Sequence, residues 1–333
     1  MVREPFFRSS AFKIQVFLLG TVLLGALLAP PLYFAGKHIA AEGWLKDGWL
    51  GGLHQSMEKA RFTRYFSRSI LLGAMLMIWP TLRWFNAGKS GRTSPKRSVL
   101  EQFQLDPNPS WWKHGLIGFL LAGGILLLLG WSYVQLGWYT PRDPGMSLSK
   151  VILGALGTGL AVGFLEEFVF RGAIHSVLAK VLKPRALFWV IAVVFALIHF
   201  FNPPKTLNAE VVDAFSGFWM VGKVFEHFFQ QFGQPYFLFA EFAVLLAIGV
   251  VLGYTRMKTG SLWLGTGLHA GWVFGVKTLG ATTQQAFGPG EMMPWLGPSL
   301  RVGAISCLFV CLTGLIVWVW IRKQYGDPFA PRE

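Results

Sequence analysis

Apolar runs long enough to cross a lipid bilayer limit the fold of this chain more than any other feature. A membrane-spanning helix needs roughly 20 apolar residues, and about 17–25 are tolerated. The pattern therefore predicts an all-α fold, a polytopic membrane helix bundle with about eight transmembrane helices. The eight runs are residues 14–34, 66–86, 115–136, 150–170, 186–201, 236–255, 261–277 and 302–321.

The composition supports this class. Hydrophobic residues make up 53% of the chain and charged residues only 14%, whereas soluble domains carry about 25% charged residues. The net charge of +14 fits Lys and Arg gathered in cytoplasmic loops. Because no basic-aromatic module accompanies that charge, we expect no nucleic-acid partner.

The basic connections also favour one orientation. Most Lys-rich and Arg-rich connections fall on one side if both termini are cytoplasmic, although the loop 35–65 carries several basic residues on the other side. The first apolar run follows Arg3, Arg8 and Lys13 like a signal peptide, but its length favours a retained anchor. We expect an integral protein of a bacterial cytoplasmic (inner) membrane, with the lipid bilayer as its surroundings.

A polar stretch divides the chain. Residues 87–110 are basic and rich in Ser, Gly and Pro, which is typical of a linker. We therefore expect residues 1–110 to form an N-terminal two-helix membrane portion with this linker, and residues 111–333 a six-helix membrane core. The segment 211–229 has an apolar stripe and a polar face, which predicts an amphipathic helix at the interface rather than a ninth span.

Charged residues interrupt the fourth run at "FLEEFVFR". A charge at the bilayer centre costs at least about 2.5–3.5 kcal/mol, so such residues are candidates for function. Glu167 and Arg171 are spaced i, i+4 and are predicted to pair, with His175 further along the same helix. Glu166 points about 100° away and is left for another partner. The alternative is an ion pair that only holds the bundle together.

His199 closes the fifth run at a matching depth. Counted from the basic turn around Lys183 and Arg185, Glu166 and His199 both lie roughly 21–26 Å away along antiparallel helices. We therefore expect the carboxylate and the imidazole to meet, where they can activate a water molecule.

Other polar residues lie in the later runs. His269 is surrounded by Gly and Ala, which leave room for a neighbouring helix, a water or a substrate. Glu241 is interpreted as a carboxylate that reaches the membrane interface. Cys307 and Cys311 are interpreted as apolar packing residues, neither metal ligands nor a disulfide.

Together these stretches resemble the CAAX protease and bacteriocin-processing family, also called Abi, which includes the type II CAAX prenyl endopeptidase. The family's first motif, Glu-Glu-x-x-x-Arg, is matched by Glu166, Glu167 and Arg171. Its second motif, Phe-x-x-x-His, is matched by Phe195 and His199.

The third motif of that family is matched only in part. It reads His-x-x-x-Asn or Asp, and here His269 is followed by Val273 where the amide or acid belongs. The resemblance covers residues 150–277, and the N-terminal third has no motif match.

The resemblance implies an eight-helix intramembrane glutamic endopeptidase that needs no cofactor and acts on a membrane-associated peptide or protein. It implies that Glu166 and His199 activate water for attack on a peptide carbonyl. His269 would then stabilise the oxyanion, while Arg171 orients the pair formed by Glu166 and Glu167.

Several alternatives stay open on the sequence alone. Glu166, His199 and His269 also make a plausible zinc set, although the resemblance favours a metal-free reaction. The same groups would suit a transporter or proton relay. Val273 favours a catalytically silent immunity or scaffold protein, unless Asn202 supplies the missing donor. The sequence leaves the substrate and the oligomeric state open.

Overall fold

The computed structural model describes residues 9–47, 51–86, 110–203, 207 and 211–325. The described residues are mostly helical, which confirms the predicted all-α membrane fold. Two short strands, β1 (Tyr139–Pro141) and β2 (Thr283–Gln285), pair antiparallel. The predicted linker 87–110 lies outside the described residues except for Ser110.

The chain forms two compact units, Met1–Ser94 with Ile198–Gly233 and Pro95–Leu197 with Gln234–Glu333. This grouping assigns the segment after residue 197 to the N-terminal helices. The functional division at residue 110 stays a prediction.

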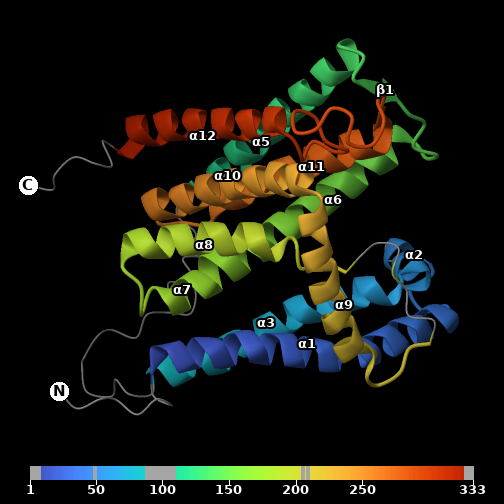
Figure 1. Ribbon diagram of the computed structural model, residues 1–333, viewed down its shortest axis with the longest axis vertical. Coiled ribbons are helices and arrows are strands. Elements are labelled where there is room, and N and C mark those ends of the chain that lie inside the picture. Colours follow the sequence, from blue (N-terminus) through green and yellow to red (C-terminus); the bar gives the residue numbers. More distant parts are fainter. Residues whose placement is uncertain (1–8, 48–50, 87–109, 204–206, 208–210, 326–333) are drawn as a thin grey trace, which may run out of the picture. The chain divides into compact units, whose positions relative to one another are not determined.

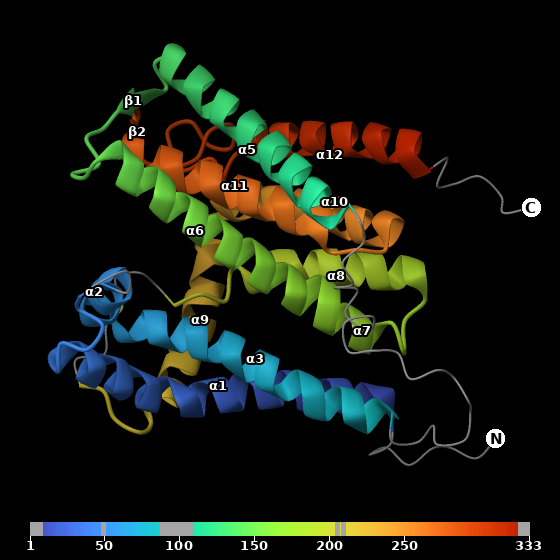
Figure 2. The ribbon, with the colours of Figure 1, turned by 180° about the vertical axis from the view of Figure 1, so that it is seen from behind.

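The first unit is built on two long apolar helices. Its elements are α1 (Ser10–Ala41), α2 (Gly51–Lys59), α3 (Phe62–Asn86), α9 (Ser216–Gln230) and the 3-10 turn η4 (Gln231–Gly233). Helices α1 and α3 lie side by side in both views (Figure 1, Figure 2). They approach closely at Gly25, which has no side chain. A Cβ at this position would lie only 2.7 Å from the Cα of Ile70.

Helix α9 packs its apolar stripe onto this pair. Met220 and Val224 share a buried cluster with Ala26, Phe62 and Phe66. The opposite face is polar, where Lys223 and Glu226 form an exposed ion pair of 2.7 Å. The predicted amphipathic helix is thus present, beginning at Ser216 rather than near residue 211, and its place at a membrane interface stays a prediction.

The second unit contains the remaining helices. They are α5 (Trp111–Gln135), α6 (Leu148–Glu167), the π-helix η3 (Phe168–Ile174), α7 (His175–Leu178), α8 (Pro184–Ile198), α10 (Pro235–Thr259), α11 (Trp263–Thr282) and α12 (Ala304–Tyr325).

Helix α11 is the centre of this unit, because it packs against α5, α6 and α10 (Figure 2). Glycines permit the close approach. A Cβ on Gly163 of α6 would lie 2.7 Å from the backbone nitrogen of Ala270, and one on Gly118 of α5 would lie 2.6 Å from the carbonyl of Leu264. Such small residues let membrane helices approach backbone to backbone.

Six described helices are long and apolar enough to cross a membrane: Phe12–Ala41, Phe62–Phe85, Trp111–Gln135, Leu148–Leu178, Pro235–Thr259 and Ala304–Gln324. The other two predicted runs are also helices, but they do not qualify as spans by length and composition. Helix α8 has only 15 residues. Helix α11 has 20 residues, but its glycines, His269 and Lys277 lower its mean hydropathy. Its first half is buried within protein, so it does not need an apolar surface for lipid.

Candidate active site

Glu167 and Arg171 form a buried ion pair at the end of α6. The Arg171 Nη1 donates to Glu167 Oε1 at 2.8 Å, and each side chain is 1% exposed. The i, i+4 pair that the sequence predicts is therefore present. A buried carboxylate needs such a partner, because a desolvated charge without one costs several kcal/mol.

The pair spans the junction between α6 and the π-helix η3. Glu167 is the last residue of α6, and Arg171 lies within η3. The buried Arg256 of α10 donates from Nε to the backbone carbonyl of Arg171 at 2.8 Å. Arg171 in turn donates from Nη2 to the carbonyl of Gly249 at 3.2 Å. Wide π turns are rare and occur often at functional sites, and here α10 fixes the turn from two sides.

His269 brings the third motif to the two glutamates. Its Nδ1 lies 3.1 Å from Glu167 Oε1, and its Nε2 lies 3.7 Å from Glu166 Oε2. The close packing of α6 on α11 makes this contact possible. One imidazole thus lies against both carboxylates.

The two glutamates differ in accessibility. The side chain of Glu166 is 27% exposed, against 1% for Glu167. Glu167 Oε1 is already bonded to both Arg171 and His269. Glu166 is therefore the more accessible of the two side chains, although its Oε2, the oxygen beside His269, is buried.

Phe195 of α8 connects the cation and the imidazole. The Arg171 guanidinium carbon lies 4.3 Å from the centre of the Phe195 ring, within the range of a cation–π contact. The same ring meets His269 edge-on, with centroids 5.8 Å apart. The sequence singled out Phe195 only as part of a pattern, and the contact explains what the ring does.

Residues 148–275 match the family model described as type II CAAX prenyl endopeptidase Rce1-like. This match covers the helices of the second unit that carry the first and third motifs, and it supports a relationship to the CAAX protease family. No curated protein and no solved structure matches the chain. The match supports a peptide hydrolase of the CAAX type, and the six described helices that qualify as spans support an integral membrane protein.

The second CAAX protease motif ends at a unit boundary. His199 follows directly after the last residue of α8, and it belongs to the first compact unit. Its carbonyl accepts a hydrogen bond from the side-chain amide of Asn202 at 2.6 Å. The expected meeting of His199 with Glu166 stays a prediction. So does the oxyanion role of Asn202, whose amide nitrogen already donates once.

The third CAAX protease motif departs from the family pattern at Val273. This residue lies one turn after His269 on α11 and is half-buried. A valine side chain offers no hydrogen-bond donor. Val273 therefore cannot replace the amide or acid that the family motif has at this position of α11.

The other polar residues predicted from the sequence lie elsewhere. His175 begins α7 and is half-buried. The interpretation of Glu241 as an interfacial carboxylate is wrong, because this residue is 5% exposed and pairs with Arg301 at 2.5 Å. Arg301 lies 60 positions away in the sequence, so spacing gave no signal for it. Cys307 and Cys311 are both free thiols on α12.

The described residues contain no group of three or more His, Cys, Asp or Glu side chains that could hold a metal ion. The alternative zinc set of Glu166, His199 and His269 joins residues of both compact units, so it stays a prediction.

Proposed function

We propose that this CAAX protease homologue is a glutamic-type intramembrane endopeptidase in which Glu166 is the general base. The observation that carries the proposal is the asymmetry of the glutamate pair. Glu167 is enclosed and charge-balanced, whereas Glu166 is partly exposed beside the same imidazole. A general base must reach the proton that it removes.

His269 suits the role of oxyanion donor. A carboxylate accepts but does not donate, so Nδ1 of His269 carries the hydrogen in its bond to Glu167. This leaves Nε2 directed towards the Glu166 side of the site. When Nε2 is also protonated, it can donate to the negative charge that develops on a peptide carbonyl oxygen.

The proposed reaction is hydrolysis of a peptide bond. Glu166 removes a proton from water, and the resulting hydroxide attacks the carbonyl carbon. His269 donates a hydrogen bond to the oxyanion, and Glu166 returns the proton to the leaving amine as the C–N bond breaks. By the family pattern, His199 shares the polarisation of the water. Arg171 pairs with Glu167, and Glu167 in turn holds His269 in place.

The test is Glu166→Gln in the full-length protein reconstituted in liposomes. Glutamine keeps the size of the side chain but cannot accept a proton from water, so we expect cleavage to fall by about a hundredfold or more. Glu226→Gln on α9 is the matched control, since Glu226 is exposed and lies outside the motifs. Candidate substrates come from a comparison of membrane-protein termini between cells that carry wild-type protein and cells that carry Glu166→Gln.

Thermal stability in detergent provides the second readout. We expect the Glu166→Gln protein to unfold at the wild-type temperature, because Glu166 is not the enclosed partner of Arg171. Wild-type cleavage by the folded Glu166→Gln variant would overturn the assignment of the base.

A further inference from the structure

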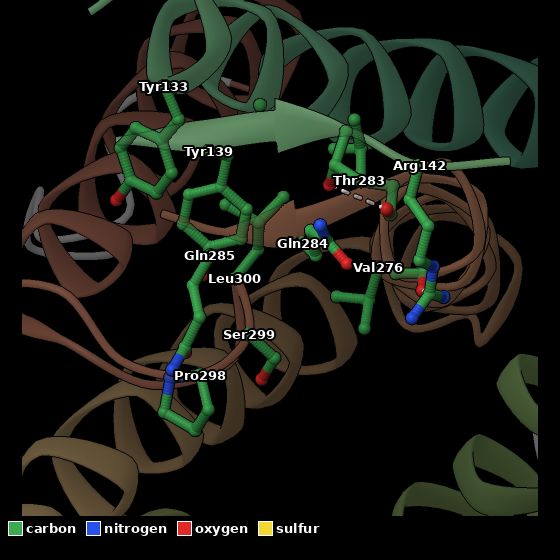
Figure 3. A pocket seen from close by; sticks show the side chains of 13 residues that line it. Tyr133, Tyr139, Arg142, Val276, Thr283, Gln284, Gln285, Pro298, Ser299 and Leu300 are labelled. Atoms are coloured by element: carbon green, nitrogen blue, oxygen red, sulfur yellow. Dashed lines mark hydrogen bonds between the residues drawn. The ribbon is translucent and has the colours of Figure 1, made fainter. Parts of the chain in front are cut away.

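The second unit contains a cavity of about 280 Å³ near the far end of α11. The end of α5, both strands and the loop 298–300 form its walls. Figure 3 shows Tyr133 and Tyr139 at one end of this cavity and Arg142 at the other, with Gln284 and Ser299 between them. Drug-sized ligands occupy roughly 300–1,000 Å³, so this cavity suits one or two amino-acid side chains.

The cavity has fixed walls. The Tyr139 hydroxyl donates to the carbonyl of Gly297 at 2.7 Å, and Glu241 pairs with Arg301 on the other side of the loop. Burial raises the pKa of Tyr139 to about 12, so its phenol keeps the proton that it donates. The Thr283 hydroxyl donates to the carbonyl of Leu279 at 2.7 Å (Figure 3). The loop and the strand are therefore held before any ligand arrives.

The outer edge of β2 lies beside this cavity. Tyr139 pairs with Gln285, and Arg142 donates from its backbone to Thr282 while Ala286 donates to Trp138. In an antiparallel pair, hydrogen-bonded and non-hydrogen-bonded positions alternate. The backbone N–H and C=O of Gln285 therefore point away from β1. The described part of the chain contributes no third strand to this sheet.

The cavity lies at a peptide-sized distance from His269. Val276 and Gly280 line it, and they follow His269 by seven and eleven residues on the same helix. At 1.5 Å per residue these steps correspond to about 10 and 16 Å. An extended peptide covers about 3.3–3.6 Å per residue, so three to five residues span the gap.

The side-chain directions on α11 agree with such a path. Steps of 100° per residue place Val273, Val276 and Gly280 within about 40° of the direction of His269. Exposure rises along this row, from the buried His269 through the half-buried valines to the exposed Gly280. One row of α11 thus runs from the glutamate pair to the cavity.

We propose that the cavity and the β2 edge form a subsite that binds an extended segment of the peptide substrate. The segment adds to the edge of β2 through the backbone of Gln285, as in recognition by strand addition. One apolar or aromatic side chain enters the cavity beside the two packed tyrosine rings, three to five residues from the bond that is cleaved. This inference rests on the proposed protease function.

Two pairs of variants test the subsite. Gln284→Trp fills the cavity, and Thr140→Trp is its control, because Thr140 is the paired residue on β1 and does not line the cavity. Gln285→Pro removes the outward N–H at an edge position where proline is tolerated. Gln285→Ala is its control, because it also removes the side-chain bond to Phe287 but keeps the N–H.

The probe is a pool of fluorescent peptides with varied apolar side chains, long enough to reach both sites. It is added to the full-length protein in liposomes, and both binding and cleavage positions are measured. We expect Gln284→Trp and Gln285→Pro to weaken binding by about tenfold, which corresponds to about 1.4 kcal/mol. We expect Thr140→Trp to bind like the wild type, and Gln285→Ala to bind more tightly than Gln285→Pro because it keeps the N–H. In the wild type, the selected side chain should lie three to five residues from the cut.

The outcomes separate the two proposals. Binding that depends on Gln284 and Gln285 without any cleavage would support the subsite and overturn the protease assignment. Cleavage that neither variant alters would support the protease and overturn the subsite. A wild-type protein that neither binds nor cleaves the pool would overturn both.

Discussion

Arg171 makes three different contacts with one planar cation. Its two terminal nitrogens donate to Glu167 and to the carbonyl of Gly249, and its face lies on the ring of Phe195. Lysine could not do this, because its ammonium is a point charge without a flat face. The arginine of the first motif therefore ties together three separate helices as well as balancing a charge.

Removing this cation should leave Glu167 buried without its charge partner. We expect Arg171→Gln to lower the free energy of unfolding by about 3–5 kcal/mol. The double variant Glu167→Gln/Arg171→Gln should lose less, because neither charge is then buried alone. Unfolding in mixed micelles measures both values. Equal losses in the single and the double variant would show that the ion pair is not the source of the stability.

A substitution at Val273 is expected to increase the activity rather than reduce it. Asparagine at this half-buried position would place an amide one turn from His269, where the family pattern has a donor. Removing one oxyanion donor typically costs 10²–10³ in kcat, so we expect Val273→Asn to raise kcat by about tenfold with little change in KM. Val273→Leu should leave kcat unchanged. Equal kcat values for the two variants would contradict the role of this position.

Sequence spacing predicts contacts within a helix better than contacts between helices. The i, i+4 rule was enough to pair Glu167 with Arg171. It could not show that His269 contacts both glutamates, because that depends on how α6 and α11 are aligned along their length. Glu241 was misinterpreted for the same reason, since its partner Arg301 lies beyond another helix.

At the scale of elements, the site depends on how closely α6 and α11 approach. Gly159 and Gly163 of α6 face Ala270, the neighbour of His269. Two small residues at this spacing favour a close approach of another helix, but the spacing alone does not identify the partner helix. The π-helix η3 was not predictable, because its residues also fit a regular α-helix and the wide turn depends on contacts from α10.

Two glycines of α6 provide a matched comparison. A Cβ at Gly163 would lie 2.7 Å from the backbone nitrogen of Ala270, whereas a Cβ at Gly157 would meet nothing within 4 Å. We expect Gly163→Val to separate the helices, to lower the stability by about 1–3 kcal/mol and to reduce cleavage by more than tenfold. Gly157→Val should retain both. Cleavage kinetics and thermal unfolding of the two proteins provide the comparison, and similar losses would contradict it.

At the scale of the whole molecule, an even number of membrane-spanning helices predicts that both ends of the chain lie on the same side of the membrane. Six described helices qualify as spans, and eight runs were expected from the sequence. Either number returns the chain to its starting side. The basic residues Arg322 and Lys323 in the last turn of α12 favour the cytoplasm for that side.

Reporter fusions at each terminus test this topology. We expect a cytoplasmic reporter to be active at both ends and an exported reporter to be inactive at both. Opposite results at the two ends would mean an odd number of crossings, and one of the helices would then have to lie along the membrane.

The burial of α11 also has a consequence for how the protein is made. A weakly apolar helix inserts poorly from the translocon on its own. Its packing partners α5, α6 and α10 all precede it in the chain, so they are synthesised before α11 leaves the ribosome. We expect α11 to enter the membrane against helices that are already there. Helices α5, α6 and α10 thus form the surface against which the helix that carries His269 inserts, because they come earlier in the chain.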